Sequence, residues 1–247
     1  MVSEPEFIIP DWPAPKGVKA VSTTRTGGFS VAPWDSLNFG DHVGDDPQKV
    51  GQNRLRLADW TGIPVAEFRF MDQVHGIEFA ELPAELPVQA DGCVTSQPRV
   101  PCLVMAADCL PVLFCNRAGT RVAAAHAGWR GLCQGVLEQA VAQFDDPAEL
   151  MAWLGPAIGP EQFEVGVEVR EAFVEKDSEA LQAFVPGRAR GHFLADLYSL
   201  ARQRLTSAGV TEIYGGHWCT FSDPERFFSY RRDGVTGRMA SLIFIEY

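Results

Sequence analysis

The sequence lacks any apolar run close to the roughly 20 residues that a membrane-spanning helix needs. Its first residues, MVSEPEFIIPDWPAPKG, are acidic and interrupted by proline. They therefore lack the basic start and apolar centre of a secretory signal. We expect a soluble, cytoplasmic protein without a membrane partner.

Clusters of basic residues are scarce as well. The net charge is −11, and no basic stretch is longer than the one in SYRRDG. Proteins that bind nucleic acid need clustered Lys and Arg to replace the counterions of the phosphate backbone. We therefore expect no nucleic-acid partner, although one or two arginines in a cleft can still hold a phosphate group locally.

Paired cysteines are absent. None of the six cysteines forms a C-x-x-C pair, which argues against a structural zinc ribbon and against a thioredoxin-like redox motif. Most cysteines of a cytosolic chain are small buried hydrophobic residues. A cysteine with a chemical role must therefore be identified by its neighbours.

What is present is an ordinary globular composition, with 46% hydrophobic and 21% charged residues in 247 positions. Strand-like and helix-like segments are mixed without a repeat or a long linker. We predict one α+β domain over residues 1–247, with helices packed outside several strands. The expected strands are GVKAVSTTR, two segments around a turn at His75-Gly76, VLFCN, TRVAAA, MAWLGPAIGP, VTEIYGGHWCT and RMASLIFIEY.

Helices are predicted from apolar spacing and from capping residues. Asp46-Pro47 is a typical start for a helix in PQKVGQNRLRLADWTG, and Asp196 can cap LYSLARQRLTSAG. Apolar residues recur at helical spacing from Leu132 to Phe144. VGVEVREAFVEKD and SEALQAFVPG are also predicted to be helical.

The segment VLFCNRAGTRVAAA predicts a β-hairpin. A loop of two or four residues around Arg117-Ala118 places Cys109 directly opposite His126, whereas a three-residue loop shifts the partner by one. Directly opposed Cβ atoms lie about 4.5–5.5 Å apart, which suits a shared metal or a thiolate–imidazolium pair. Pro111 cannot donate to a ladder, so this strand is expected to lie at an edge or to be broken near Cys109.

Other residues are candidates for the same site. His75 precedes a glycine and is our choice for a third metal ligand, because three protein ligands with an open position are typical of catalytic zinc. A turn histidine bonded to backbone is the alternative. Asp91 lies in a predicted turn, Arg25 at a strand end, and Tyr230, Arg231, Arg232 and Arg238 in an aromatic-rich segment. These groups could clamp an anion through the arginines or stack on a planar base; the alternative is that they are solvated turn charges. The helix N-terminus near Gly131 is a further candidate for holding phosphate.

A series of motifs resembles one known family. STTRTGGFS, SLNFGDHVGDDP, QVHG, ADGCV, AADCLPV, AAAHAGWRG, GPAIGP, FEVGVEV and CTFSDPERFFSYRRDGVTGRMASLI follow its pattern in order over about residues 18–245. This is the YfiH-type laccase-domain family, also called the polyphenol oxidase or peptidoglycan editing factor family. One departure is Ser222, where many members have a second cysteine.

The resemblance implies a layered α/β/β/α sandwich similar to the catalytic domain of the cytotoxic necrotizing factor. It also implies a zinc site formed by His75, Cys109 and His126, with copper as a substitute metal. Members resemble purine nucleoside phosphorylases that use phosphate to split adenosine, inosine and methylthioadenosine, with adenosine deaminase activity. A true laccase needs roughly ten histidines for its copper centres, whereas this chain has five, so we reject that chemistry.

We therefore expect a zinc-dependent purine nucleoside enzyme. Its expected catalytic residues are Cys109, Asp91 and Arg25, and Arg25, Asn38 and Arg231 are expected to bind substrate. Asp91 or Asp108 would protonate the leaving ammonia in deamination. The alternative is a metal-free hydrolase or amidase that edits peptidoglycan precursors, with Cys109 as nucleophile and His126 as base. A third hypothesis is a binding module without catalysis. The oligomeric state is left open.

Overall fold

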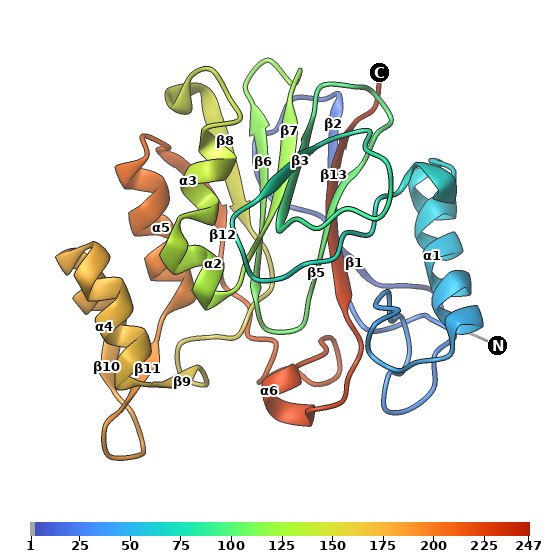
Figure 1. Cartoon of the computed structure of the whole chain (residues 1–247). Coiled ribbons are helices and arrows are strands. Elements are labelled where there is room, and N and C mark those ends of the chain that lie inside the picture. The colour runs from blue at the N-terminus through green and yellow to red at the C-terminus, as the bar shows by residue number, and fades with distance from the viewer. Residues whose placement is uncertain (1–2) are drawn as a thin grey trace.

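Two β-sheets lie face to face, and helices cover the outer face of each (Figure 1). The computed structural model describes residues 3–247. The larger sheet has the strand order β12-β8-β6-β7-β4-β3, and the smaller one has the order β1-β2-β13-β5. A separate three-stranded sheet, β10-β11-β9, stands at one end of the molecule. None of the helices in residues 3–247 is long and apolar enough to cross a membrane.

The larger sheet consists of β3 (Phe79–Glu81), β4 (Gly92–Thr95), β6 (Leu110–Asn116), β7 (Val122–Ala127), β8 (Leu150–Leu154) and β12 (Glu212–Gly215). The smaller sheet consists of β1 (Phe7–Ile8), β2 (Val18–Thr23), β5 (Cys102–Ala106) and β13 (Met239–Ile245). The end sheet has β9 (Glu164–Gly166), β10 (Phe184–Pro186) and β11 (His192–Ala195). The helices are α1 (Pro47–Thr61), α2 (Trp129–Gln134), α3 (Val136–Val141), α4 (Val167–Lys176), α5 (Leu197–Ser207) and α6 (Tyr230–Asp233).

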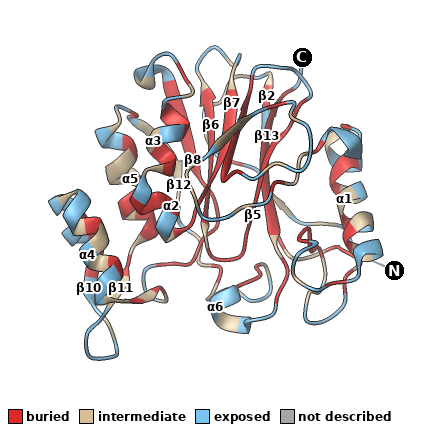
Figure 2. Cartoon of the chain, in the orientation of Figure 1, coloured by how far each residue is buried: buried red, intermediate tan, exposed pale blue. Residues whose placement is uncertain are grey.

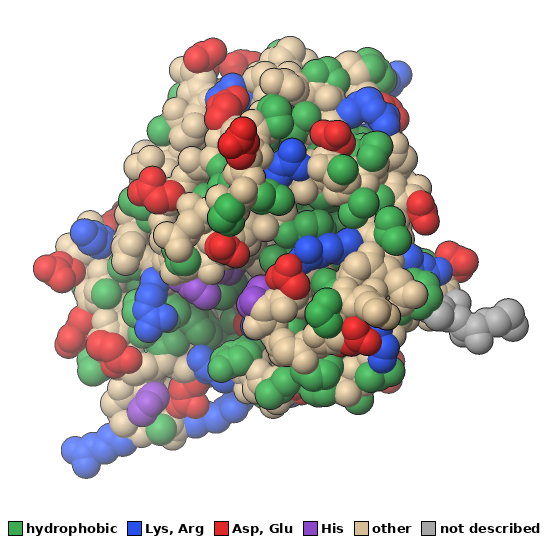
Figure 3. Space-filling model, turned by 45° about the vertical axis from the view of Figure 1, so that its right-hand side comes forward, with side chains coloured by type: hydrophobic (Ala, Val, Ile, Leu, Met, Phe, Trp, Pro, Cys, Tyr) green, Lys and Arg blue, Asp and Glu red, His purple; other side chains and the backbone are tan. Residues whose placement is uncertain are grey.

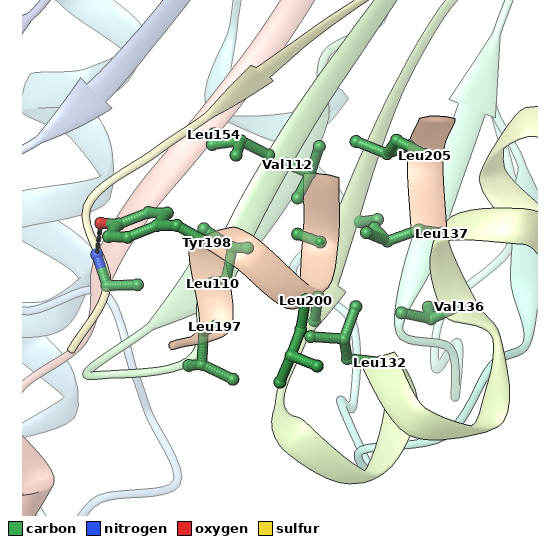
Figure 4. Packing of buried hydrophobic residues seen from close by; sticks show 14 of the residues in the cluster. Leu110, Val112, Leu132, Val136, Leu137, Leu154, Leu197, Tyr198, Leu200 and Leu205 are labelled. Carbon is green, nitrogen blue, oxygen red and sulfur yellow. Dashed lines mark hydrogen bonds between the residues drawn. The ribbon is translucent and has the colours of Figure 1, made fainter. Parts of the chain in front are cut away.

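Hydrophobic packing divides the molecule into four layers. One cluster joins the large sheet to α2, α3 and α5, a second fills the space between the sheets, and a third joins the small sheet to α1. Figure 4 shows part of the first cluster, where Leu200 and Leu205 of α5 lie close to Leu137 of α3. Figure 2 shows the strands of both sheets buried along most of their length. The predicted α/β/β/α layering is therefore confirmed; the likeness to the cytotoxic necrotizing factor stays a prediction.

Most predicted elements are found. Asp46 caps α1 and Asp196 caps α5, each by accepting a backbone N–H. The helix predicted from Leu132 begins earlier, at Trp129, and is broken into α2 and α3 at Gly135, which has φ 108°. SEALQAFVPG forms a 3-10 helix followed by β10 instead of an α-helix.

The predicted pair of strands around His75-Gly76 is wrong. Only β3 forms, and it pairs in parallel with β4. The chain before the turn makes one isolated bridge, between Asp72 and Gln89. The backbone N–H groups of Val74, His75 and Gly76 donate to the Asp91 side chain, so a carboxylate takes the place of a partner strand.

The hairpin prediction is correct in kind and wrong in register. His126 lies opposite Pro111, two residues away from the predicted partner Cys109. The side chain of Asn116 accepts the N–H groups of Thr120 and Arg121, and the loop lies one residue later than the predicted four-residue loop. Of the two alternatives predicted for Pro111, an edge strand does not fit, because β6 lies inside the sheet, whereas a break near Cys109 does, because β6 begins at Leu110. Its ladder with β8 starts only at Val112, and the Pro111 carbonyl accepts the N–H of Gly155.

Candidate metal centre

Three side chains from distant parts of the sequence meet at the ends of two inner strands of the large sheet. His75 comes from the loop before β3, Cys109 from the residue before β6, and His126 from the end of β7. Their ligand atoms all lie within 4.8 Å of one another, and the Cys109 Sγ lies 3.7 Å from the His75 Nε2. Within residues 3–247 this is the one group of three or more potential metal ligands that is so arranged.

The Cys109 thiol still faces His126, although the observed register differs by two residues from the predicted one. A shift of two residues preserves the face on which a side chain lies, because side chains alternate with period two along a strand. Cys109 is therefore a diagonal neighbour of His126, still within reach across the sheet. The chain turns sharply just before it, at Asp108, whose φ is 94°.

The Asp91 carboxylate orients both histidines. It is fully buried, and its Oδ1 contacts the His126 Nδ1 at 2.8 Å and accepts the His75 N–H at 2.9 Å. Its Oδ2 accepts the N–H groups of Val74 and Gly76. Burial raises the pKa of Asp91, but hydrogen bonds from His126 and Gly76 outweigh it, so the pKa falls below its usual value. With Nδ1 occupied, His126 offers its Nε2 to the centre.

Cys109 and His126 form a strongly polarised pair. Burial raises the pKa of the Cys109 thiol, but the charge of His126 and hydrogen bonds from both histidines bring it down to about 6. Burial lowers the pKa of His126, whereas the Cys109 thiolate and Asp91 raise it to about 9. Between these values, the metal-free pair is a thiolate beside an imidazolium.

This pairing predicts the pH dependence of Cys109 alkylation. In metal-free protein, the rate of modification by iodoacetamide is expected to rise through about pH 6 and then level off, because the thiolate is the reactive form. An ordinary cysteine reaches this midpoint at about pH 8.5. Peptide mass spectrometry follows Cys109, with Cys219 measured in the same digest. A midpoint above pH 8 for Cys109 would contradict the prediction.

The donor set fits a zinc ion. Zinc bonds to thiolate sulfur at about 2.3 Å and to imidazole nitrogen at about 2.0–2.1 Å, so two of its ligands lie roughly 3.3–3.7 Å apart. The Sγ–Nε2 distance of 3.7 Å matches this separation. A buried carboxylate behind His126 is the usual partner of a metal-binding histidine. The metal itself is not identified by this geometry, since copper also accepts imidazole and thiolate ligands.

Gly128 leaves room for this cluster. A Cβ at this position would lie 2.6 Å from the His75 Cδ2 and 3.1 Å from the Cys109 Sγ. Gly128→Ala is therefore expected to displace two ligands. Overpacking of this kind costs about 1–3 kcal/mol, which corresponds to a roughly tenfold to hundredfold loss of metal affinity.

Metal titration of purified protein tests this prediction. The matched control is Gly51→Ala in α1, where nothing lies within 4 Å of the added Cβ. The prediction fails if both variants bind metal as the original protein does.

A cavity of about 440 Å³ opens beside the three ligands. Its wall includes Phe163, Tyr230, Arg231 and Arg238. In Figure 3, histidine side chains border a hollow on the surface of the molecule. The cavity combines aromatic and cationic groups, which suits a planar ligand that carries or accompanies an anion.

The structure brings some of the predicted residues together and separates others. Arg231 and Asp108 line the cavity. Arg25 lies outside it, where its guanidinium bonds to the carbonyls of Asp35 and Pro224 and stacks on Phe228. The prediction that Arg25 takes part in this site therefore does not fit the structure.

Asn38 and Asp91 lie behind the cavity wall. Asn38 is fully buried, and its amide donates to Gly40 and Asp45 while its oxygen accepts the N–H groups of Gly40 and Arg238. All its hydrogen-bonding capacity is used within the protein. Like Asp91, it supports residues of the wall and does not face the cavity. Gly131 lies inside α2, not at its start.

Several cavity residues were not predicted as site residues. His42, Gln73 and Phe163 all contribute to the wall. Tyr230 and Arg238, predicted as candidates to clamp an anion or stack on a planar base, also line it. Gln73 holds the chain before His75 against the end of β5 by two hydrogen bonds with Met105. The signal for Gln73 was its position as the first residue of the QVHG motif. Phe163 and His42 come from loops whose direction no local pattern indicates.

Comparisons with known proteins identify the family of this chain. A family model described as "Multi-copper polyphenol oxidoreductase laccase" matches residues 19–246. A purine nucleoside phosphorylase of Pseudomonas aeruginosa is 54% identical over 241 residues, covering 97% of this chain and 98% of its own. The purine nucleoside phosphorylase YfiH of Escherichia coli is 54% identical over 243 residues, covering 97% and 99%.

Solved structures share the fold. A crystal structure of a Neisseria meningitidis protein has a TM-score of 0.92 at 49% identity and covers 98% of this chain and 99% of its own. YlmD of Geobacillus stearothermophilus has a TM-score of 0.84 at 32% identity, covering 94% and 93%. The match over nearly the whole chain and the shared fold mean that this protein belongs to the laccase-like YfiH family.

Proposed function

We propose that the protein is a zinc-dependent purine nucleoside phosphorylase that acts on adenosine, inosine and methylthioadenosine and also deaminates adenosine. The observation that carries this proposal is the His75–Cys109–His126 cluster on the wall of a cavity with aromatic and cationic side chains. Two relatives at 54% identity are named purine nucleoside phosphorylases, which supports the same reaction class. The domain over residues 1–247 would act as one catalytic unit.

In phosphorolysis, an oxygen of phosphate bonds to the anomeric carbon while the glycosidic C–N bond breaks. The purine leaves with the electron pair of that bond and takes up a proton. A zinc ion held by the three ligands would supply Lewis-acid chemistry. The chain itself contributes Arg231 as a donor to phosphate oxygens and Phe163 as an apolar wall.

In deamination, water replaces the amine of the purine and ammonia leaves. Of the two acids considered for protonating the ammonia, Asp108 lies on the cavity wall, whereas Asp91 is buried behind His126 and saturated by four donors. We therefore assign the proton donor to Asp108 and a positioning role to Asp91.

A second candidate function is a metal-free cysteine hydrolase or amidase acting on peptidoglycan precursors. The observation in its favour is the thiolate–imidazolium pair of Cys109 and His126 with Asp91 behind the imidazole. Laccase chemistry is not proposed, because five histidines are too few for several copper centres.

The deciding experiment measures metal content and product formation from adenosine, inosine and methylthioadenosine. We expect ribose 1-phosphate or its methylthio analogue only when phosphate is present, hypoxanthine from inosine, and inosine from adenosine. Removing the metal with a chelator should abolish turnover, and zinc should restore it. Activity on peptide or amide substrates that survives chelation and is lost on Cys109 alkylation would instead support the hydrolase.

A further inference from the structure

The cavity wall is cationic on an otherwise acidic protein. The chain has a net charge of −11, yet the wall carries Arg231 and Arg238 with one carboxylate, that of Asp108. The Asp108 oxygens already accept the Thr220 hydroxyl and the Arg231 N–H, both at 2.7 Å. Neither guanidinium group forms an ion pair with this carboxylate, so both remain available to attract an anion.

Arg238 is the better positioned of the two arginines. Its side chain is half-buried, and only its Nη1 is bonded, to the carbonyls of Thr236 at 3.1 Å and Gly237 at 3.0 Å. It forms no ion pair with any acidic side chain of residues 3–247. A partly desolvated guanidinium with free N–H groups is costly unless a ligand oxygen accepts them.

The surrounding backbone fixes the stem of this side chain. The Asn38 Oδ1 accepts the backbone N–H groups of both Arg238 and Gly40, at 2.8 and 2.9 Å. Gly40 lies directly beneath the arginine, since a Cβ there would be 2.9 Å from the Arg238 Cγ. Asn38 was predicted from the sequence to bind substrate. In the structure it is instead a positioning residue for Arg238.

Arg231 faces the same space from α6. Its Nη1 donates to the Glu164 carbonyl at 2.8 Å, and its guanidinium lies 5.3 Å from the centre of the Phe163 ring. It also forms no ion pair in the described part of the chain. Two arginines held by backbone carbonyls in this way keep further N–H groups for a tetrahedral oxyanion.

We propose that Arg238 and Arg231 form the phosphate subsite of the cavity, with Arg238 as its anchor. This assignment rests on the proposed function, and it names free inorganic phosphate as the ligand. Both arginines line the same cavity as the three ligands, so the subsite lies beside the metal site. A phosphate ion bound there is placed to react at the bond that breaks. The phosphate group of a nucleotide is attached to the far side of the ribose and would not be placed in this way.

The test measures the equilibrium Kd of inorganic phosphate by calorimetry, without nucleoside, on proteins of equal metal content. Arg238→Gln and Arg231→Gln should each raise this Kd about tenfold to hundredfold, the range for a hydrogen bond to a charged group. Arg238→Lys should have a smaller effect because it keeps the charge. Arg226→Gln is the control, since Arg226 pairs with Glu6 outside the cavity and should not alter the Kd.

A further variant tests the position of Arg238 without changing a charge. Gly40→Ala should weaken phosphate binding by pushing the arginine stem, whereas Gly51→Ala should not. If Arg238→Gln fails to fold, Arg231→Gln and Gly40→Ala carry the test. Unchanged phosphate Kd values in the folded variants overturn the proposal.

Adenosine 5′-monophosphate provides the second arm. It should bind no tighter than adenosine, and its affinity should not depend on Arg238. Tight, Arg238-dependent binding of the monophosphate would assign the subsite to a phosphoester and overturn the choice of free phosphate. The phosphate Kd is measured without turnover, so it tests the subsite separately from the reaction. If phosphate binds through Arg238 but the protein does not cleave nucleosides, the proposed function is refuted and the subsite is retained.

Discussion

His75→Ala, Cys109→Ala and His126→Ala are each expected to lose the bound metal and to lower nucleoside phosphorolysis about a thousandfold or more. Each variant leaves two of the three donors that lie within 4.8 Å of one another. Two ligands hold zinc far more weakly than three, and the Lewis acid contributes several kcal/mol to the transition state, at about tenfold per 1.4 kcal/mol. Elemental analysis and steady-state kinetics measure the two effects.

The controls are a histidine and a cysteine that do not belong to the cluster. His42→Ala removes a histidine of the same cavity and should retain the metal. Cys219→Ala removes a half-buried thiol outside that cavity and should retain both metal and activity. If His75→Ala loses the metal yet retains activity that Cys109→Ala abolishes, Cys109 is a nucleophile and the hydrolase is supported. Retention of metal and activity in all three variants would refute the proposal.

Asp91→Asn is expected to lower metal affinity about tenfold to hundredfold, the usual effect of removing the carboxylate behind a metal-binding histidine. Each Asp91 oxygen accepts two donors. An amide keeps one oxygen, so two donors lose their acceptor whichever way it is turned. If its NH₂ faces His126, Nδ1 must become the acceptor and the proton moves to Nε2, where it blocks the metal.

Metal titration and thermal unfolding distinguish this effect from simple destabilisation. Two unsatisfied buried donors cost roughly 1–3 kcal/mol each, so the Tm of Asp91→Asn should fall as well. Asp45→Asn is the matched control, because Asp45 is also buried and accepts from Ser30 and Asn38 away from the metal ligands. It should lower the Tm without lowering metal affinity. Equal metal affinity in Asp91→Asn and the original protein would contradict the role of Asp91.

The sequence by itself determined much of the local structure. Capping by Asp46 and Asp196 depends on residues a few positions away, so the starts of α1 and α5 were predictable. The hairpin of β6 and β7 was also predicted, because its apolar runs and Gly119 are adjacent in the chain. The choice of His75, Cys109 and His126 depended on ordered motifs that resemble a family, and the geometry brings these three together.

Tertiary structure alone decided the register and the environment of the site. The side chain of Asn116 accepts from Thr120 and Arg121 and fixes a register that differs by two residues from the predicted one, which a count of loop residues does not reveal. Asp91 replaced a partner strand for the His75 loop, and Asn38 turned inward to hold Arg238. The contacts of Asp91 and Asn38 join residues that are separated by other elements, and the direction of a buried polar side chain follows from the donors that the fold places around it.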